Sequence, residues 1–346
     1  MVDSAGRKTL RVFTQKYLNH TEYGIGSGKA KELEEFVKES NAEQVIVDEH
    51  LTSKQIHNLE KLAGAQVIDR ERLILDIFYS RATTNEAKLQ IQLAEIRYEM
   101  PRVRKIANMT AGDERLGKGG RGEYMVDVKF RDLKHRMAFI KEKLDEAKNK
   151  RELYHQQRVK TGMPIVSLVG YTIAGKTTLF NLLSAQQKET SASLFTTLST
   201  TTRSMKIEGK KVAVLLTDTV GFISRLPTYM IDASKSTLEE SLAADLILLL
   251  IDSSEELENI KIKYYNSWNV LKDLKVDESK VSVILTKYDY DNGNSKNNVT
   301  DGIGGMQKID VIAKDLQLKD PLLISSKTGY GIHRLKNTIM ALLKNG

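Results

Sequence analysis

The apolar positions in the first eighty residues follow two different periods. Short apolar runs predict three strands, at residues 10–13, 44–48 and 66–69. Stretches with apolar side chains at helical spacing predict two helices, at residues 28–40 and 52–62. Thr52 stands where the N-cap of the second helix is expected. Strands that alternate with helices indicate a small parallel α/β unit, which we expect over residues 1–82.

From about residue 83 the pattern changes to a heptad repeat. Apolar residues recur at spacings of four and three in two series: Leu89, Leu93, Ile96, Met100, Val103 and Ala107, then Val126, Phe130, Leu133, Met137, Ile140, Leu144 and Ala147. Two such seams with a polar break predict an antiparallel helical hairpin over residues 83–162. Pro101 is expected to kink the first helix. The break at residues 117–122 has four glycines in six positions, which predicts a flexible tip.

The remainder, residues 163–346, has the pattern of one α/β domain. Six apolar runs predict strands, at residues 165–169, 204–208, 212–217, 246–251, 281–285 and 322–324. Five intervening stretches predict helices, at residues 176–186, 234–243, 255–274, 305–317 and 331–344. This alternation indicates a mixed, mostly parallel sheet with helices on both faces. Residues 290–305, rich in Asn and Gly, are expected to form a loop.

A phosphate-binding pattern follows the first strand of this domain. It fits GxxxxGK[ST] and comprises Gly170, Tyr171, Thr172, Ile173, Ala174, Gly175, Lys176 and Thr177, followed by Thr178. A strand before it and a helix after it place the loop at a helix N-terminus, where backbone N–H groups and the helix dipole favour a polyphosphate. Lys176 is expected to reach the β- and γ-phosphates, and the Thr177 hydroxyl to ligate Mg²⁺.

Two further segments contain residues that are expected to bind Mg²⁺ and the γ-phosphate. Asp218 and Gly221 form a DxxG pattern, in which Asp218 is expected to hold Mg²⁺ through water and the Gly221 N–H to contact the γ-phosphate. Between the two patterns lies a Thr-rich stretch at residues 194–203, expected to be a switch loop ordered by the triphosphate. One hydroxyl there should complete the Mg²⁺ shell, and we favour Thr197. The expected catalytic groups are therefore Lys176, Gly221 and Thr197.

The guanine base is expected to be read by two later loops. Residues Thr286, Lys287, Tyr288 and Asp289 resemble an NKxD motif, and Ser325, Ser326 and Lys327 follow the last strand. A carboxylate at Asp289 can accept hydrogen bonds from guanine N1–H and its 2-amino group, whereas adenine offers neither donor pattern. The stem of Lys287 can cover the base. A backbone N–H near Ser326 is expected to meet guanine O6.

Two positions depart from the usual GTPase pattern. Thr286 replaces an Asn that ties the base loop to the phosphate loop, and the shorter Thr is expected to brace it less well. Phe222 occupies the place where many GTPases carry a water-orienting Gln. Phe cannot orient water, so we expect slow intrinsic hydrolysis that depends on a partner or another loop.

Composition narrows the class of protein. The chain of 346 residues is 40% hydrophobic and 28% charged, as expected of a soluble globular protein. It has no Cys, which excludes disulfides, thiolate metal sites and Cys nucleophiles. Its start has no apolar signal core, and its longest apolar run, residues 246–251, is too short to span a bilayer. We expect a cytoplasmic monomer.

The positive charge is concentrated in one segment. Residues 101–160 contain 17 Lys and Arg against 9 Asp and Glu, which accounts for the whole formal net charge of +8. Such a localised excess favours a polyanionic partner over an ordinary solvated surface.

A glycine-rich stretch at residues 22–29 has two interpretations. It can be a phosphate-binding loop or a structural loop that caps a helix.

These residues resemble HflX, a family of translation-associated GTPases related to Obg. The resemblance extends from about Arg11 to the C-terminus and rests on five stretches, at residues 24–29, 67–78, 170–177, 194–203 and 218–222. It implies an N-terminal α/β domain, a helical hairpin and a P-loop GTPase domain. It also implies Mg²⁺-dependent GTP hydrolysis, binding to the large ribosomal subunit and, in bacterial relatives, splitting of stalled ribosomes. The chain differs from the family's usual pattern at Ile173, where Asn is usual, and in a tip that lacks Gly-Pro-Gly-Glu.

The leading interpretation is a GTP-switched factor that binds rRNA of the large ribosomal subunit through the basic hairpin and acts on stalled or idle ribosomes. Two alternatives remain open. One is an RNA-binding or remodelling protein regulated by its GTPase domain, with nucleotide use by the N-terminal domain. The other is a GTPase that signals to a protein or membrane partner, which leaves peripheral membrane association open. DNA is not an expected partner.

Overall fold

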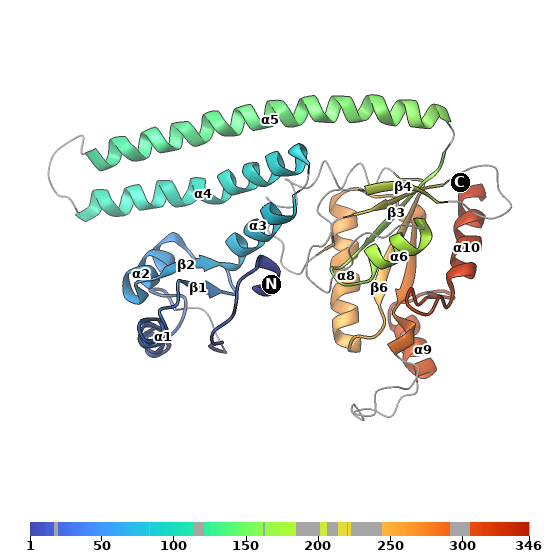
Figure 1. The fold of residues 1–346 in the computed structure, drawn as a ribbon, viewed down its shortest axis with the longest axis horizontal. Coiled ribbons are helices and arrows are strands. Elements are labelled where there is room, and N and C mark those ends of the chain that lie inside the picture. Colours follow the sequence, from blue (N-terminus) through green and yellow to red (C-terminus); the bar gives the residue numbers. More distant parts are fainter. Residues whose placement is uncertain are drawn as a thin grey trace. The chain divides into compact units, whose positions relative to one another are not determined.

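The structure, a computed structural model, describes most of the chain. The described residues are 1–16, 20–82, 84–113, 121–161, 163–184, 201–205, 214–219, 221–222, 244–290 and 305–345. Side chains are described within these ranges except at residues 104–113, 121–126, 151–152, 154–161, 201, 290, 305–307 and 344–345. The chain divides into two compact units, the first built on residues 1–149 and the second beginning at Lys150 (Figure 1).

In the N-terminal part, both expected helices and two of the three expected strands form, and a further helix, α3 (Arg70–Arg81), follows the second strand. After a short 3-10 helix, η1 (Asp3–Ala5), the elements are α1 (Ser27–Ser40), β1 (Gln44–Val47), α2 (Ser53–Ala63), β2 (Gln66–Asp69) and α3 (Arg70–Arg81). β1 and β2 pair in parallel, with Gln44 opposite Gln66. Thr52 is the N-cap of α2, where it forms a capping box with Gln55. Buried apolar side chains of α1, α2 and both strands form one core cluster.

The strand expected at residues 10–13 is not formed. Leu10 and Val12 are 58% and 72% exposed, so the face they share is not covered by the described residues. Phe13 is held differently, because its ring packs edge-on against Phe36 with 5.7 Å between centroids. The Arg11 guanidinium lies over the Phe13 ring, 4.7 Å from its centroid. Aromatic anchoring at one position therefore replaces strand pairing in this segment.

The heptad seams form the expected helical hairpin. Its helices are α4 (Asn85–Asp113) and α5 (Arg121–Thr161), which lie side by side (Figure 1). The buried residues of the seam come from both helices: Leu93, Ile96, Val103, Leu133 and Ile140. Pro101 lies inside α4, which continues to Asp113. Gly122, expected in the non-helical tip, belongs to the first turn of α5, where backbone N–H groups need no intrahelical partner. Residues 114–120 of the tip lie outside the described residues.

The second unit contains a six-stranded sheet with the order β4-β5-β3-β6-β7-β8. The strands are β3 (Ile165–Gly170), β4 (Thr201–Met205), β5 (Val214–Asp218), β6 (Leu246–Asp252), β7 (Val281–Thr286) and β8 (Leu322–Leu323). The described helices are α6 (Lys176–Ser184), α8 (Leu257–Asp273), α9 (Gly305–Asp315) and α10 (Ile332–Asn345), with short 3-10 helices η2 (Glu278–Lys280) and η3 (Tyr288–Tyr290). Only β4 runs antiparallel to its neighbour, β5.

Alternating residues of the sheet face two separate cores. On one face, Ile247 and Leu249 of β6 pack with α8 and α9. On the other, Leu246, Leu248 and Leu250 pack with α6 and α10. Because both faces are covered, β6 is a continuous apolar strand rather than an alternating one. This architecture is that of a P-loop GTPase domain and confirms the expected fold class.

The edge strand β4 begins earlier than the sequence pattern predicts. A strand was expected at residues 204–208, with Thr201, Thr202 and Arg203 assigned to the switch loop, but β4 spans Thr201–Met205. Thr202 and Thr217 have their hydroxyl oxygens 3.1 Å apart, and β-branched Thr suits a strand at least as well as a loop.

Several expectations cannot be placed because they lie outside the described residues. These are the helix at 234–243, most of the loop at 290–305, and the part of the switch loop that contains Thr197. Within the described part of the chain, no helix has both the length and the apolar composition needed to cross a membrane.

Candidate nucleotide site

The loop between β3 and α6 has a backbone that restricts which residues can occupy it. Gly170 has a φ of 143°, and a Cβ at this position would lie 2.4 Å from the Leu250 carbonyl oxygen. Gly175 has a φ of 88°. Both glycines are therefore required by the shape of the loop. Ile173 has a φ of 68°, in the left-handed region that a β-branched residue resists, and its side chain is 48% exposed.

Lys176, the first residue of α6, is buried beneath this loop. Its ammonium donates to the carbonyl oxygens of Gly170 at 3.0 Å and Tyr171 at 2.6 Å. An ammonium has three N–H donors, so these contacts leave one for a ligand. Burial lowers the pKa of Lys176 to about 8, while the nearby Asp218 carboxylate acts in the opposite direction. A buried cation that is costly to keep charged is suited to an anionic ligand.

Two oxygen donors that were expected to hold Mg²⁺ lie together. The Thr177 hydroxyl donates to Oδ2 of Asp218 at 3.1 Å, and both side chains are buried. Asp218 ends β5 and pairs in register with Leu168 of β3, which brings it beside the phosphate loop. Hydroxyl and carboxylate oxygens are the hard ligands that Mg²⁺ prefers, so this donor set fits the ion. The third expected ligand, Thr197, lies outside the described residues.

The DxxG segment is bonded to the phosphate loop through its backbone. The Phe222 N–H donates to the Gly170 carbonyl at 2.9 Å, and the Thr172 N–H donates to the Phe222 carbonyl at 2.8 Å. A Cβ at Gly221 would lie 2.9 Å from Nζ of Lys176 and 2.8 Å from Cγ2 of Thr172. Position 221 therefore requires glycine so that the segment can approach the lysine.

Phe222 has a structural role that its sequence position did not reveal. Its side chain is 6% exposed and packs in the same core cluster as Tyr171 and Ile260 of α8. The ring therefore anchors the first residue after DxxG to the core. In the sequence, the position of Phe222 directly after the DxxG glycine indicates only that a Gln is replaced there, and no local pattern indicates its burial.

The two loops that are expected to read the base meet through side-chain and backbone hydrogen bonds. The Ser325 hydroxyl donates to Oδ1 of Asp289 at 2.7 Å, and the Thr328 N–H donates to that hydroxyl at 3.1 Å. The Tyr288 N–H donates to the Ile324 carbonyl at 3.2 Å. One oxygen of the Asp289 carboxylate is thus held in place. Ser326 is half-buried and Lys327 is exposed beside them.

Thr286 reaches the phosphate loop despite being shorter than Asn. Its hydroxyl lies 2.9 Å from the Ala174 carbonyl and 3.2 Å from the Ile251 carbonyl. The tie between the two loops, which we expected to be weaker, is therefore present.

Asp252, at the end of β6, was not identified from the sequence. Lys287 has a φ of 60°, and its ammonium pairs with Oδ2 of Asp252 at 2.6 Å. The Ser254 N–H and hydroxyl hold the other carboxylate oxygen at 3.0 and 2.6 Å. Asp252 thus fixes the side chain expected to cover the base. An acidic residue ending a continuous apolar strand was the signal that could have found it.

Sheet order explains why these groups converge. Four adjacent strands run parallel in the order β5, β3, β6 and β7, so their carboxyl ends lie at one edge of the sheet. At these ends lie, in the same order, the DxxG segment, the phosphate loop, Asp252 and the base loop. The structure brings together every expected site residue that it describes.

Three protein-family models match the chain in succession. A model described as GTP-binding GTPase N-terminal matches residues 1–79, and one described as GTP-binding GTPase Middle Region matches residues 81–158. A third, described as 50S ribosome-binding GTPase, matches residues 165–287.

Similar proteins match along most of the chain. GTPase HflX of Thermococcus kodakarensis is 40% identical over 289 residues, which are 84% of this chain and 65% of that protein, slightly less than two thirds of its length. GTPase HflX of Methanocaldococcus jannaschii is 38% identical over 318 residues, 92% of this chain and 75% of that protein. A GTP-binding protein from Sulfolobus solfataricus, crystallised with GDP, shares the fold with a TM-score of 0.52 at 23% identity, covering 99% of this chain and 93% of its own. The chain belongs to the HflX family of GTPases.

Proposed function

We propose that this protein binds GTP and GDP, hydrolyses GTP with Mg²⁺, and uses the bound nucleotide to control its association with the large ribosomal subunit. The observation that carries the proposal is the convergence of three groups at one sheet edge. These are the buried Lys176 ammonium, the Thr177–Asp218 oxygen pair, and the Asp289 carboxylate held by Ser325. They match the phosphate, the metal and the base of a guanine nucleotide.

Each group has a distinct task in this proposal. The remaining donor of Lys176 contacts the β- and γ-phosphates, and backbone N–H groups of residues 173–178 surround the phosphate oxygens. Thr177, Asp218 and Thr197 would hold Mg²⁺, which would supply positive charge against the charge that develops on the phosphates. The Gly221 N–H binds the γ-phosphate. Because Phe222 is buried in the core and carries no polar group, it supplies no help to the attacking water.

The base is selected by Asp289. Its carboxylate accepts from guanine N1–H and the 2-amino group, and the stem of Lys287 covers the base while its ammonium pairs with Asp252. An adenine would leave the carboxylate unpaired, which costs about 1–3 kcal/mol or more for a charged group.

The ribosomal part of the proposal rests on charge and on family. Residues 101–160 carry the whole net positive charge, and several of these basic side chains are exposed on α5: Lys129, Arg131, Lys134, Arg136 and Lys141. The matching family model for residues 165–287 is that of a 50S ribosome-binding GTPase. We propose that the hairpin at residues 83–162 contacts rRNA, and that residues 163–346 bind the nucleotide.

Co-sedimentation with large ribosomal subunits tests this proposal. We expect binding with a non-hydrolysable GTP analogue, weaker binding with GDP, and a steep loss of binding with added salt, because phosphate contacts release counterions. A variant with Lys129, Lys134 and Lys141 changed to Gln should bind less. In a matched control, Lys31, Lys38 and Lys61 are changed to Gln instead. These lysines are exposed on α1 and α2, outside the hairpin, so their loss should leave binding unchanged. Equal binding in all nucleotide states would favour an RNA-binding protein without a nucleotide switch.

A further inference from the structure

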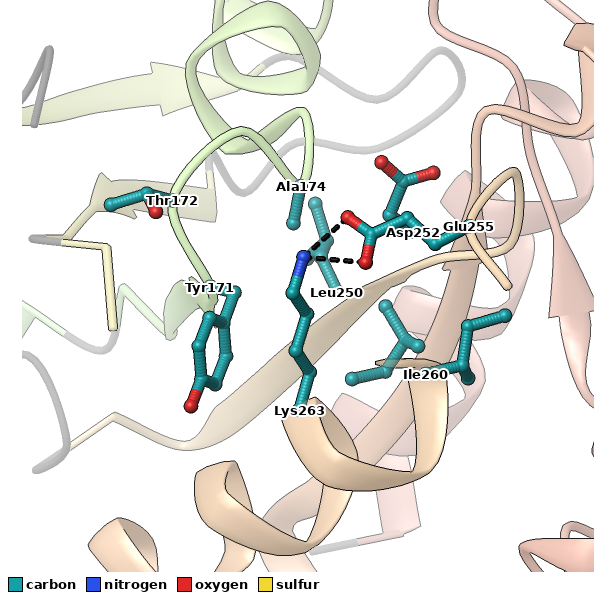
Figure 2. A pocket seen from close by; sticks show the side chains of 9 residues that line it. Tyr171, Thr172, Ala174, Leu250, Asp252, Glu255, Ile260 and Lys263 are labelled. Carbon is teal, nitrogen blue, oxygen red and sulfur yellow. Dashed lines mark hydrogen bonds and ion pairs between the residues drawn. The ribbon is translucent and has the colours of Figure 1, made fainter. Parts of the chain in front are cut away.

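A pocket lies between the phosphate loop and α8, on the side of the loop where Tyr171 is buried. Its walls come from the loop, the end of β6 and the first turns of α8, and include Tyr171, Leu250, Glu255, Ile260 and Lys263. Figure 2 shows the Lys263 side chain running beside the Tyr171 ring, with its ammonium directed at a carboxylate. None of the expected functions of the site uses these charged residues.

Lys263 and Glu255 form a partly buried ion pair. The Lys263 ammonium contacts both carboxylate oxygens of Glu255, and the two side chains are 28% and 25% exposed. The same ammonium lies 5.7 Å from the centroid of the Tyr171 ring, within the range of a cation–π contact. The ring itself is 5% exposed. Lys263 is therefore fixed between a carboxylate and the one aromatic side chain of the phosphate loop.

The backbone around Tyr171 connects directly to the proposed catalytic groups. Its carbonyl accepts the 2.6 Å hydrogen bond from Lys176. The residues on either side, Gly170 and Thr172, exchange the two backbone hydrogen bonds with Phe222. Tyr171 and Phe222 also share one buried cluster. A displacement of Tyr171 would therefore move the Lys176 ammonium and the segment containing Gly221 together.

We propose that Lys263 and Glu255 are positioning residues for recognition of the γ-phosphate, and that they act through Tyr171. This inference rests on the proposed binding of GTP at the site. The Lys263–Glu255 pair fixes the Tyr171 ring against α8, and the fixed loop presents the Lys176 ammonium and Gly221 to the γ-phosphate. GDP lacks the group that Gly221 contacts, so loss of the pair affects the triphosphate more than the diphosphate.

The test is the ratio of dissociation constants for a non-hydrolysable GTP analogue and GDP. Lys263→Met retains the stem and removes the charge. It is expected to raise this ratio about twofold to thirtyfold, the range of a cation–π contact expressed as affinity. Lys263→Arg retains a cation and should keep the ratio near that of the unmodified protein. Glu255→Gln, which removes the other charge, provides a second variant and should shift the ratio in the same direction.

Two controls separate positioning from a general loss of stability. Lys261→Met removes a lysine from the same helix that pairs with Asp315 at 2.9 Å, away from the loop, and should leave the ratio unchanged. In a Tyr171→Leu background, Lys263→Met should have no further effect, because the ring through which it acts is absent. An unchanged ratio in both Lys263→Met and Glu255→Gln, or equal weakening of both nucleotides, would overturn the inference. If the unmodified protein bound neither nucleotide, the proposed function itself would be at fault.

Discussion

Lys176 shows how burial sets the chemistry of a single residue. Burial lowers its pKa to about 8 from an ordinary value near 10.5. The free energy of unfolding contributed by this group is therefore smallest below pH 8, where a charged ammonium is buried. It rises between pH 8 and 10.5, where only the unfolded chain keeps the proton. A bound phosphate should raise the pKa of Lys176 again, because its negative charge favours the charged ammonium over the neutral amine.

We therefore expect affinity for a GTP analogue to depend on pH through Lys176. Below pH 8 the ammonium is already charged and contributes no pH dependence. Above pH 8 binding must take up a proton, so affinity should fall by up to about tenfold per pH unit. Calorimetric titrations from pH 7 to 9 measure both the affinity and the proton uptake. A Lys176→Met variant should lose hydrolysis and this proton uptake but remain folded, and uptake that persisted in it would assign the proton to another group.

Ile173 is expected to destabilise the phosphate loop. A β-branched residue at a φ of 68° carries about 1–2 kcal/mol of backbone strain, and its side chain, 48% exposed, recovers little by burial. Ile173→Asn places a residue that tolerates this conformation and should stabilise the nucleotide-free protein by about 1 kcal/mol. Thermal unfolding without nucleotide measures the change. A lower melting temperature for Asn than for Ile would show that Ile173 makes contacts that outweigh its strain.

Asp289 is expected to determine the choice of base. Asp289→Asn replaces an acceptor with a group that donates, so affinity for GDP should fall at least a hundredfold, the effect of unpaired polar groups in a site. Affinity for xanthosine diphosphate should rise, because the xanthine C2 carbonyl can accept from the new amide. Fluorescence titrations with GDP, ADP and xanthosine diphosphate distinguish altered specificity from unfolding. A variant that bound GDP normally would exclude Asp289 from base recognition.

At the scale of elements, the N-terminal part depends on one buried carboxylate. Asp69 ends β2, is fully buried, and accepts hydrogen bonds from the N–H groups of Leu51 and Arg72, from the Tyr98 hydroxyl and from Arg102 at 2.7 Å. The Arg102 guanidinium also lies over the Tyr98 ring, 3.6 Å from its centroid. Burial and the Asp69 carboxylate raise the pKa of Tyr98, which keeps its hydroxyl protonated as a donor. Asp69 thus joins the sheet to helix α4.

Removing Arg102 should therefore be costly. Arg102→Met leaves the Asp69 carboxylate buried without its cation, and we expect a loss of about 3–5 kcal/mol in the free energy of unfolding. Lys38→Met removes one member of an exposed pair on α1 and should cost less than about 1 kcal/mol. Urea unfolding of both variants measures the difference. Similar small losses in the two would mean that the remaining donors to Asp69 are sufficient.

The sequence predicted elements well where one period dominated and poorly where it did not. Two patterns have a single interpretation. The heptad seams of α4 and α5 require a second helix along their length, and the continuous apolar run of β6 requires cover on both faces. Leu10 and Val12 have a strand pattern, but no surface among the described residues covers them. Thr201 and Thr202 suit both a loop and a strand, and only the pairing with β5 decides between them.

The candidate site divides in the same way. Residues proposed to contact a ligand, such as Lys176 and Asp289, occur at fixed spacings after strands and can be identified from the sequence. Asp252, Phe222 and Lys263 are proposed to act through other residues, and their contacts join elements that are distant in sequence. No local pattern specifies those contacts.

At the scale of the whole molecule, we expect contact with the ribosome and GTP hydrolysis to be coupled. Phe222 stands where many GTPases carry a water-orienting Gln, and the positive charge lies in a different part of the chain, residues 101–160. If intrinsic hydrolysis is slow and the hairpin binds a polyanion, as we propose, the protein's activity should be raised by its partner. We expect basal hydrolysis to need only residues 163–346, so a change at the tip should separate the coupling from basal hydrolysis.

The most direct test is GTP turnover with and without large ribosomal subunits, for the full chain and for a deletion of residues 112–122. Alone, both proteins should hydrolyse GTP at the same slow rate, on the order of 10⁻⁴ to 10⁻² s⁻¹. Large subunits should accelerate the full chain strongly and the deletion variant much less. Acceleration of the deletion variant equal to that of the full chain would show that the hairpin tip does not sense the ribosome. No acceleration of the full chain would contradict the coupling itself.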